Sequence, residues 1–389
     1  MEAVSIIHCA DIHLGMELGG IGRKSTARKS EIKVSFQNII ERCEKQGTDL
    51  LLIAGDVFDA VNCKGEDVRD IIASLSRLTH TRVFIAPGNH DYYAEGCVYD
   101  SNRYEWPENT YIFKAGFETV VIDELKTCVS GAAFRSAHVE SSLLVGHHGM
   151  DLVADDPERK DYLQIGVLHG DVGTTGNYNP MTEEDIRLSS FDYLALGHIH
   201  KQSPVLYAGE TAYAYSGCPE GHGFDELGLK GIYEGTVEKG KVNLEYVNLC
   251  KRRYEEVNVD ISSANQRDDI KDIIKNKLDN LYGSDYAENL YKINLTGNVN
   301  ADLVDIAYIK AQLGDIYFIK IRDKSEPIID MEAVIKAGGL KGAFVLKMKS
   351  VIDKFTADGD EESAAHYRKA LAVGMRAFDR EVGYSNDNQ

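Results

Sequence analysis

Short apolar runs alternate with amphipathic stretches over the first 200 residues of the chain. Five of these runs have the length of buried strands, and they lie at residues 4–10, 50–54, 83–86, 165–168 and 193–196. Residues 30–46 and 67–78 instead carry apolar side chains near a 3.6-residue period, as amphipathic helices do. This alternation predicts an α/β fold in which helices cover the faces of a layered sheet.

After residue 200 the pattern changes to short strands separated by glycines, at 205–207, 211–215, 231–237 and 242–248. The basic run Lys251-Arg252-Arg253 marks the predicted end of a first domain, 1–250. Residues 251–323 then predict a compact unit of three strands and two helices. The last section, 324–389, predicts two amphipathic helices.

Composition limits the classes of protein that the chain can represent. The 389 residues are enough for two or three domains, and 43 basic against 62 acidic residues give a net charge of −19. This charge disfavours nucleic-acid binding over the whole surface, although a local basic patch would still serve. No apolar run approaches membrane-helix length, and no basic segment with a cleavage site precedes residues 4–10, so we expect a soluble cytoplasmic protein. The seven cysteines form no C-x-x-C pair and predict reduced, packed thiols.

Polar clusters follow each of the five apolar runs. They are Asp11-x-His13, Gly55-Asp56-x-x-Asp59, Gly88-Asn89-His90-Asp91, His169-Gly170 and Gly197-His198-x-His200. Because ligands bind at the carboxyl ends of strands in open sheets, we expect all five clusters at one sheet edge. A single cluster of this kind is weak support for a functional site, since a histidine after a strand is commonly a packing residue. Five in this order predict a site for manganese, iron or zinc, which accept carboxylate, imidazole and amide ligands.

The number of side chains is sufficient for two metal ions. Asp56 can bridge the ions, with Asp11, His13 and His200 on one and Asn89, His169 and His198 on the other. Two ions about 3.5–4 Å apart can hold a phosphate and activate a bound water. His90 is then available as the general acid for the leaving oxygen, and Asp59 can hydrogen-bond its imidazole and fix the tautomer.

These motifs resemble those of the calcineurin-like metallophosphoesterases, and more narrowly those of the SbcD-type DNA double-strand-break repair nucleases. The similar segments, within residues 4–235, are HCADIHLG (8–15), GDVFD (55–59), PGNHD (87–91), VLHG (167–170), ALGHIH (195–200) and YSGCPE (215–220). The resemblance implies a two-sheet sandwich flanked by helices, a small α+β cap domain (251–323) and C-terminal helices (324–389). It also implies that the seven metal ligands named above, and His90 as the catalytic histidine, keep those roles here.

The same resemblance implies a function and partners. The expected activity is that of a manganese-dependent DNA nuclease, homodimeric, that acts with an SMC-type ATPase (SbcC) bound through the terminal helices. Ala60 stands where the protein phosphatases of the superfamily have arginine, which disfavours a phosphoprotein phosphatase. A basic stretch with Arg23, Lys24, Arg28 and Lys29 follows the first metal cluster, and it is either a DNA contact or a solvated helix start.

Two other functions stay open at this point. One is a small-molecule or nucleotide phosphodiesterase or phosphatase that uses the same site, and the acidic net charge favours it. The other is a structural partner of an ATPase with an inactive site, which the complete ligand set disfavours. The roughly 140 residues after the first domain favour the nuclease, because small-molecule enzymes of this kind rarely need them.

Overall fold

The structure is a computed structural model that describes residues 3–379 except 101, 115, 149–155, 157 and 174. Its contacts divide the chain into an N-terminal unit, Met1–Glu255, and a C-terminal unit, Glu256–Gln389. The division lies close to the predicted end of the first domain, while a separate third domain at 324–389 stays a prediction. None of the described helices is long and apolar enough to cross a membrane.

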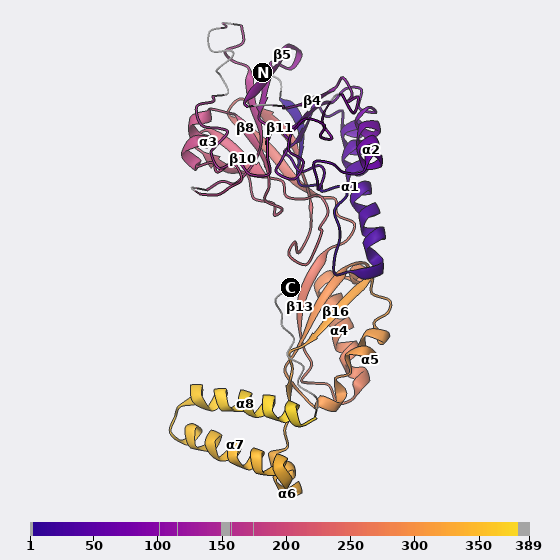
Figure 1. Ribbon diagram of the computed structural model, residues 1–389, viewed down its shortest axis with the longest axis vertical. Helices are drawn as coiled ribbons and strands as arrows, with labels where there is room; N and C mark the ends of the chain where they lie inside the picture. The colour runs from indigo at the N-terminus through magenta and orange to yellow at the C-terminus, as the bar shows by residue number, and fades with distance from the viewer. Residues whose placement is uncertain are drawn as a thin grey trace. The chain divides into compact units, whose positions relative to one another are not determined.

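The N-terminal unit contains two six-stranded sheets (Figure 1). The first has the strand order β12-β11-β1-β2-β3-β4, in which β1 to β4 run parallel. Its strands are β1 (Val4–Cys9), β2 (Leu50–Ile53), β3 (Arg82–Ile85), β4 (Thr110–Ile112), β11 (Gly231–Glu238) and β12 (Lys241–Asn248). The predicted runs at 4–10, 50–54 and 83–86 are therefore neighbouring parallel strands of one sheet.

The second sheet has the order β5-β6-β7-β8-β10-β9. Its strands are β5 (Glu118–Ile122), β6 (Thr127–Gly131), β7 (Leu163–His169), β8 (Tyr193–Gly197), β9 (Leu206–Ala208) and β10 (Thr211–Tyr215). The two sheets pack face to face, since one buried cluster joins Ile6 and Leu52 of the first to Ile165 and Ala195 of the second. The two-sheet sandwich is thus confirmed, whereas the expectation that all five motif strands share one sheet is wrong.

Helices flank the sandwich (Figure 1). They are α1 (Ser25–Gln46), α2 (Gly65–Leu75) and α3 (Glu183–Ser189). In α1 the buried residues include Ile32, Phe36 and Ile39, which recur at helical spacing as the sequence predicted. All seven cysteines are free thiols and five of them are buried, as packed thiols would be; their reduced state stays a prediction.

The C-terminal unit begins with a three-stranded sheet in the order β13-β14-β16. Its elements are β13 (Tyr254–Asp260), α4 (Arg267–Tyr282), β14 (Leu290–Thr296), α5 (Ile306–Gln312) and β16 (Phe318–Asp323), with a small pair β15 (Asn298–Val299) and β17 (Glu326–Pro327). Ile270, Ile274 and Leu278 of α4 bury one apolar face on this sheet. The strand–helix alternation that the sequence predicted for 251–323 is confirmed.

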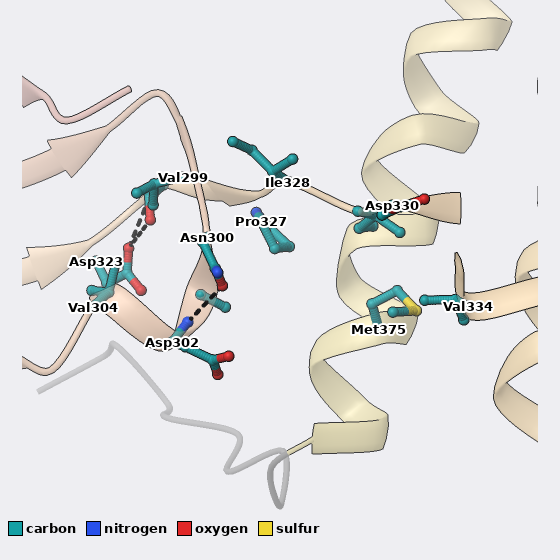
Figure 2. A pocket seen from close by; sticks show the side chains of 13 residues that line it. Val299, Asn300, Asp302, Val304, Asp323, Pro327, Ile328, Asp330, Val334 and Met375 are labelled. Atoms are coloured by element: carbon teal, nitrogen blue, oxygen red, sulfur yellow. Dashed lines mark hydrogen bonds between the residues drawn. The ribbon is translucent and has the colours of Figure 1, made fainter. Parts of the chain in front are cut away.

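Three helices complete the C-terminal unit: α6 (Met331–Ala337), α7 (Gly339–Ala357) and α8 (Glu361–Asp379). Val345 and Ile352 of α7 pack on Leu371 and Met375 of α8 in a cluster of their own. A pocket of about 310 Å³ lies beside α6 and α8 and is lined by Val299, Ile328 and Asp330, with Val334 and Met375 at its helical side (Figure 2). The sequence predicted α7 and α8 but not α6.

Candidate metal centre

The loops that carry the five polar clusters start at the carboxyl ends of strands in both sheets. Those after β1, β2 and β3 come from the first sheet, and those after β7 and β8 come from the second. Backbone hydrogen bonds join the first two loops, because the amides of Asp11 and His13 donate to the carbonyls of Gly55 and Asp56 at 3.0 Å each. The clusters therefore meet where the ends of the two sheets come together.

Strained backbone is concentrated at these loops. Asp11, His13, Asp56 and His198 have φ angles of 54°, 50°, 51° and 99°. They are four of the seven non-glycine residues with positive φ in the described chain. Such conformations cost of order 1–3 kcal/mol each and gather at functional sites. The fold thus holds four candidate ligands in backbone conformations that they would not adopt by preference.

Two glycines let side chains approach the backbone closely. A Cβ atom on Gly88 would lie 2.3 Å from Oδ1 of Asp56, and one on Gly55 would lie 2.3 Å from Nδ1 of His169. Gly55 also has a φ of 93°, a conformation that favours glycine. Only glycine at these two positions leaves room for the carboxylate and the imidazole.

Asp56 lies at the centre of the site. Its Oδ2 atom is 3.6 Å from Nε2 of His13 and 3.5 Å from Nε2 of His169. Its Oδ1 atom accepts a hydrogen bond of 3.0 Å from the backbone amide of His90. One carboxylate oxygen thus faces a histidine on each side, which is the position that a bridging ligand needs.

The remaining candidate ligands form one group on each side of Asp56. On the first side, Nε2 of His13 is 3.1 Å from Nε2 of His200, and both rings can share a metal ion with Asp11. On the second side, Oδ1 of Asn89 is 2.9 Å from Nε2 of His169 and 3.0 Å from Nδ1 of His198. The seven predicted ligands are therefore brought together around Asp56, and their division between two ions stays a prediction.

The electrostatics of this site suit a cation. Burial, with Asp56 adding to it, raises the pKa of Asp11 well above its usual range. Burial would also raise the pKa of Asp56, but His169 and His13 hold it below its ordinary value. Within the described chain neither carboxylate forms an ion pair with a lysine or arginine. Two buried carboxylates without a basic partner, among imidazole and amide ligands, fit divalent metal ions.

His90 differs from the seven ligands because its side chain is 43% exposed. Its Nδ1 atom is 3.3 Å from the carbonyl oxygen of Asp59 and 3.5 Å from the Oδ1 atom of that residue. The same Oδ1 atom is 3.2 Å from Nδ1 of His13. Asp59 therefore contacts both histidines, and its action on His90 in particular stays a prediction.

Sequence reasoning gave no role to three buried residues around the ligands. Asp91 accepts hydrogen bonds from the amides of Val57 and Gly88 at 2.8 Å each, and one from the hydroxyl of Tyr99, so it ties the loops after β2 and β3 together. Glu226 contacts His200, and His222 contacts Glu226. The aspartate at the end of PGNHD signalled the first of these, whereas no short motif signals the other two.

The structure corrects one of the four proposed DNA contacts. Arg28 is fully buried, and its guanidinium donates to Glu31 at 2.6 Å and to Glu220 at 2.8 Å. Because this arginine is buried and held by two carboxylates, it cannot reach a phosphate at the surface, so the prediction for this residue is wrong. Lys29 is partly exposed and pairs with the exposed Glu17 at 2.6 Å.

The other two candidates, Arg23 and Lys24, belong to a 3-10 helix, Gly22–Lys24, that precedes α1. Arg23 is exposed and Lys24 is half-buried. Their contact with DNA stays a prediction.

Two pockets flank the candidate ligands. One of about 220 Å³ adjoins His13 and is lined by Lys29, Lys33 and Lys64 together with Glu66 and Asp67. The other, of about 400 Å³, adjoins His198 and His200 and is lined by Lys201 and the buried Lys230 together with Asp225 and Glu226. Lysines and carboxylates therefore lie together on both sides of the metal centre.

Comparison with known proteins gives relatives that share this region. The chain is 29% identical over 272 residues to the uncharacterized metallophosphoesterase YhaO of Bacillus subtilis (strain 168), a match that covers 67% of this chain and 64% of that protein. It is 34% identical over 271 residues to the DNA double-strand break repair protein Mre11 of Aeropyrum pernix, again with 67% and 64% covered. A shorter match, 30% over 151 residues, covers 38% of this chain and 29% of the SbcD subunit of the SbcCD nuclease of Rhodobacter capsulatus.

The chain thus spans less than two thirds of the length of YhaO and of the A. pernix protein. Residues 4–202 match the family described as calcineurin-like phosphoesterase, and they include all seven candidate metal ligands and His90. From these sequence matches and the two-sheet architecture, we conclude that the chain belongs to the calcineurin-like phosphoesterase family, whose fold uses divalent metal ions.

Proposed function

We propose that the chain hydrolyses phosphodiester bonds of DNA, as the exonuclease and endonuclease subunit of an SbcCD-like repair complex. The observation that carries this proposal is the position of Asp56, with one group of candidate ligands on each side and lysines at both flanks. The names of two relatives, a DNA double-strand break repair protein and a nuclease subunit, support DNA as the substrate.

In this proposal Asp11, His13 and His200 hold one divalent ion, Asn89, His169 and His198 hold the other, and Asp56 contacts both. When bound, such ions polarise a phosphoryl oxygen and lower the pKa of water. Manganese is the proposed metal. The buried carboxylates Asp11 and Asp56 would offset part of the positive charge of these ions.

His90 supplies the proton in this mechanism. Its ring is the exposed one beside the ligands, so a leaving oxygen can reach it from solvent. The backbone amide of His90 is fixed by Asp56, and its Nδ1 atom faces Asp59, which leaves Nε2 to donate. A general acid in this position contributes about 10²–10⁴-fold to the rate.

Phosphate contacts are proposed for the lysines at the two flanks. Lys64 is exposed at the pocket beside His13, and Lys201 is exposed at the pocket beside His198 and His200. A polymer that crosses the metal centre would place phosphates near both lysines, whereas a small phosphodiester would reach one flank at most. The net charge of −19 favours the second candidate function, a small-molecule or nucleotide phosphodiesterase at the same site.

The proposed partners are DNA, an SMC-type ATPase and a second copy of the chain, and the proposed location is the cytoplasm. The C-terminal helices support the ATPase. Leu340 is 79% exposed and Leu346 is 55% exposed on α7, while Val373 is exposed on α8. Apolar side chains exposed on adjacent helices are typical of surfaces that dock a partner helix.

A digestion assay tests the proposed function. The purified full chain, with manganese, is given labelled linear duplex, hairpin and single-stranded DNA and a small chromogenic phosphodiester. We expect metal-dependent cleavage of DNA that the substitution Lys64→Ala with Lys201→Ala weakens, while turnover of the small substrate is unchanged. Cleavage of the small phosphodiester without any cleavage of DNA, with or without the ATPase, would favour the second candidate instead.

A further inference from the structure

The histidine ligand His200 is held from behind by a buried carboxylate. Its Nδ1 atom lies 2.5 Å from Oε1 of Glu226. Glu226 belongs to the loop after β10 and lies outside the residues that match the family, 4–202. Because an ionised carboxylate can only accept hydrogen bonds, Nδ1 of His200 carries the proton. Nε2, which faces His13 at 3.1 Å, is then the nitrogen that would bind a metal ion.

Glu226 is itself surrounded by donors. The backbone amide of His222 donates to Oε2 at 2.8 Å, Nδ1 of His222 lies 3.0 Å from the same oxygen, and the thiol of Cys218 lies 3.4 Å from it. With His200, four donors face the roughly four acceptor positions of one carboxylate. Four donors around one carboxylate fit its ionised form, with both oxygens hydrogen-bonded.

His222 connects this carboxylate to a second part of the metal centre. Its Nε2 atom lies 3.3 Å from the carbonyl oxygen of Ile12, the residue between Asp11 and His13. Its two ring nitrogens thus face acceptors on both sides, the carboxylate of Glu226 and the carbonyl oxygen of Ile12. The ring is buried and packs edge-on against His13. One side chain thus holds both Glu226 and the loop that carries two candidate ligands.

We propose that Glu226 is a positioning residue that fixes the tautomer and orientation of His200, and that His222 holds Glu226 in place. This inference rests on the two-metal site of the proposed function. Histidine ligands commonly donate their second ring proton to a carboxylate, and loss of that partner typically weakens metal binding about 10–100-fold. The hydrogen-bonded distances around Glu226 favour this arrangement over a further metal site formed by His200, Cys218, His222 and Glu226, although the ligand atoms of these four residues lie within 4.8 Å of one another.

Manganese titration of the metal-free full chain, followed by calorimetry, tests the proposal. In Glu226→Gln we expect one of the two binding steps to weaken about 10–100-fold while the other is unchanged. His222→Gln should weaken the same step by less. NMR of the histidine ring nitrogens should report the proton on Nδ1 of His200 in the wild type and a changed tautomer distribution in Glu226→Gln.

Glu220→Gln is the matched control, because Glu220 is buried in the same loop but bonds Arg28 and Ser35 instead of a candidate ligand. We expect it to lower stability without changing either binding step. Two wild-type-like binding steps in Glu226→Gln would overturn the proposal. So would a third bound metal in the wild type that both Cys218→Ser and Glu226→Gln remove, since Glu226 would then be a ligand. These measurements need no DNA cleavage, so failure of the nuclease assay leaves them interpretable.

Discussion

The two units of the chain bury different kinds of side chain. The N-terminal unit encloses the carboxylates Asp11 and Asp56 and the imidazoles of His13 and His169 within one site. The main buried cluster of the C-terminal unit is apolar, while several large apolar side chains of that unit, Leu340 among them, are exposed on its helices. The first unit therefore buries charge, while exposed apolar side chains occur in both units, and the most exposed of them, Leu340, lies in the second. Each cost is expected where a ligand or partner offsets it: divalent ions in one unit and another protein in the other.

The largest expected effect concerns the metal centre of the N-terminal unit. Asp56→Asn should abolish most metal binding and nearly all phosphodiesterase activity, because the bridging oxygen would lose its charge. Metal content and turnover measure the two effects. Wild-type metal content in Asp56→Asn would contradict the central position assigned to Asp56.

The next largest effect tests whether catalysis and metal binding depend on different residues of the N-terminal unit. His90→Asn should keep both ions and slow hydrolysis by about 10²–10⁴-fold, since only the proton donor is lost. Metal content and single-turnover rates give the comparison, with Asp59→Asn as a second variant. If His90→Asn instead bound less metal and kept its turnover on the metal that remained bound, the roles assigned to His90 and to the ligands would be exchanged or wrong.

A third prediction concerns the independence of the C-terminal helices. Ile352→Ala should lower the stability of the α7–α8 pair by about 2–5 kcal/mol, because it leaves a cavity in their apolar cluster. Metal affinity should not change. Leu346→Ala, at an exposed position of the same helix, is the control and should be nearly neutral for stability. Hydrogen exchange resolved by segment measures both, and weakened metal binding in Ile352→Ala would show that the units are coupled.

A chain truncated after Asp323 tests the binding of partners. This truncated chain should keep metal binding and cleavage of small phosphodiesters, and it should no longer co-purify with the SMC-type ATPase. Binding of the ATPase at an affinity close to that of the full chain would exclude α6 to α8 as the main contact.

The smallest effect concerns pH and the paired charges of the N-terminal unit. Glu31 is bonded to Arg28 at 2.6 Å and to Arg252 at 2.9 Å, and these partners outweigh burial and hold its pKa below the ordinary value. A lowered pKa means that the pair contributes stability above the ordinary glutamate range, and that this stability is lost as pH falls below it. Denaturant midpoints between pH 7 and pH 3 should fall more for the wild type than for Glu31→Gln. If the denaturant midpoints of the two proteins fell equally with pH, this prediction would be wrong.

The sequence predicted much of the fold because the central strands are continuous apolar runs. β1, β2, β3, β7 and β8 are all buried strands found this way. Their division between two sheets could not be predicted, since an apolar run does not specify its neighbour. β5 was missed because four of its five residues are half-buried and its pattern lacks a clear apolar face.

The sequence predicted those residues of the site that lie within short motifs. Asp56 comes three residues after the end of β2 and His169 is the last residue of β7, so the ends of these strands place them. The outcome for Arg28 depended on Glu220, which is 192 residues away in sequence, and the partner of His200 is likewise in a loop that no short motif specifies. Distant pairing of this kind becomes visible only in the folded chain.

Gly88 shows how such a site would look in a mutational survey. Gly88 binds no ion and moves no proton, yet a methyl group there would overlap Oδ1 of Asp56 at 2.3 Å. Gly88→Ala should therefore score as severely as a change of ligand, although no chemical group of the reaction is lost. Intolerance to substitution alone would class this position with the catalytic residues. Metal titration of the variant would identify it correctly, as a residue whose contribution is the space that it leaves empty.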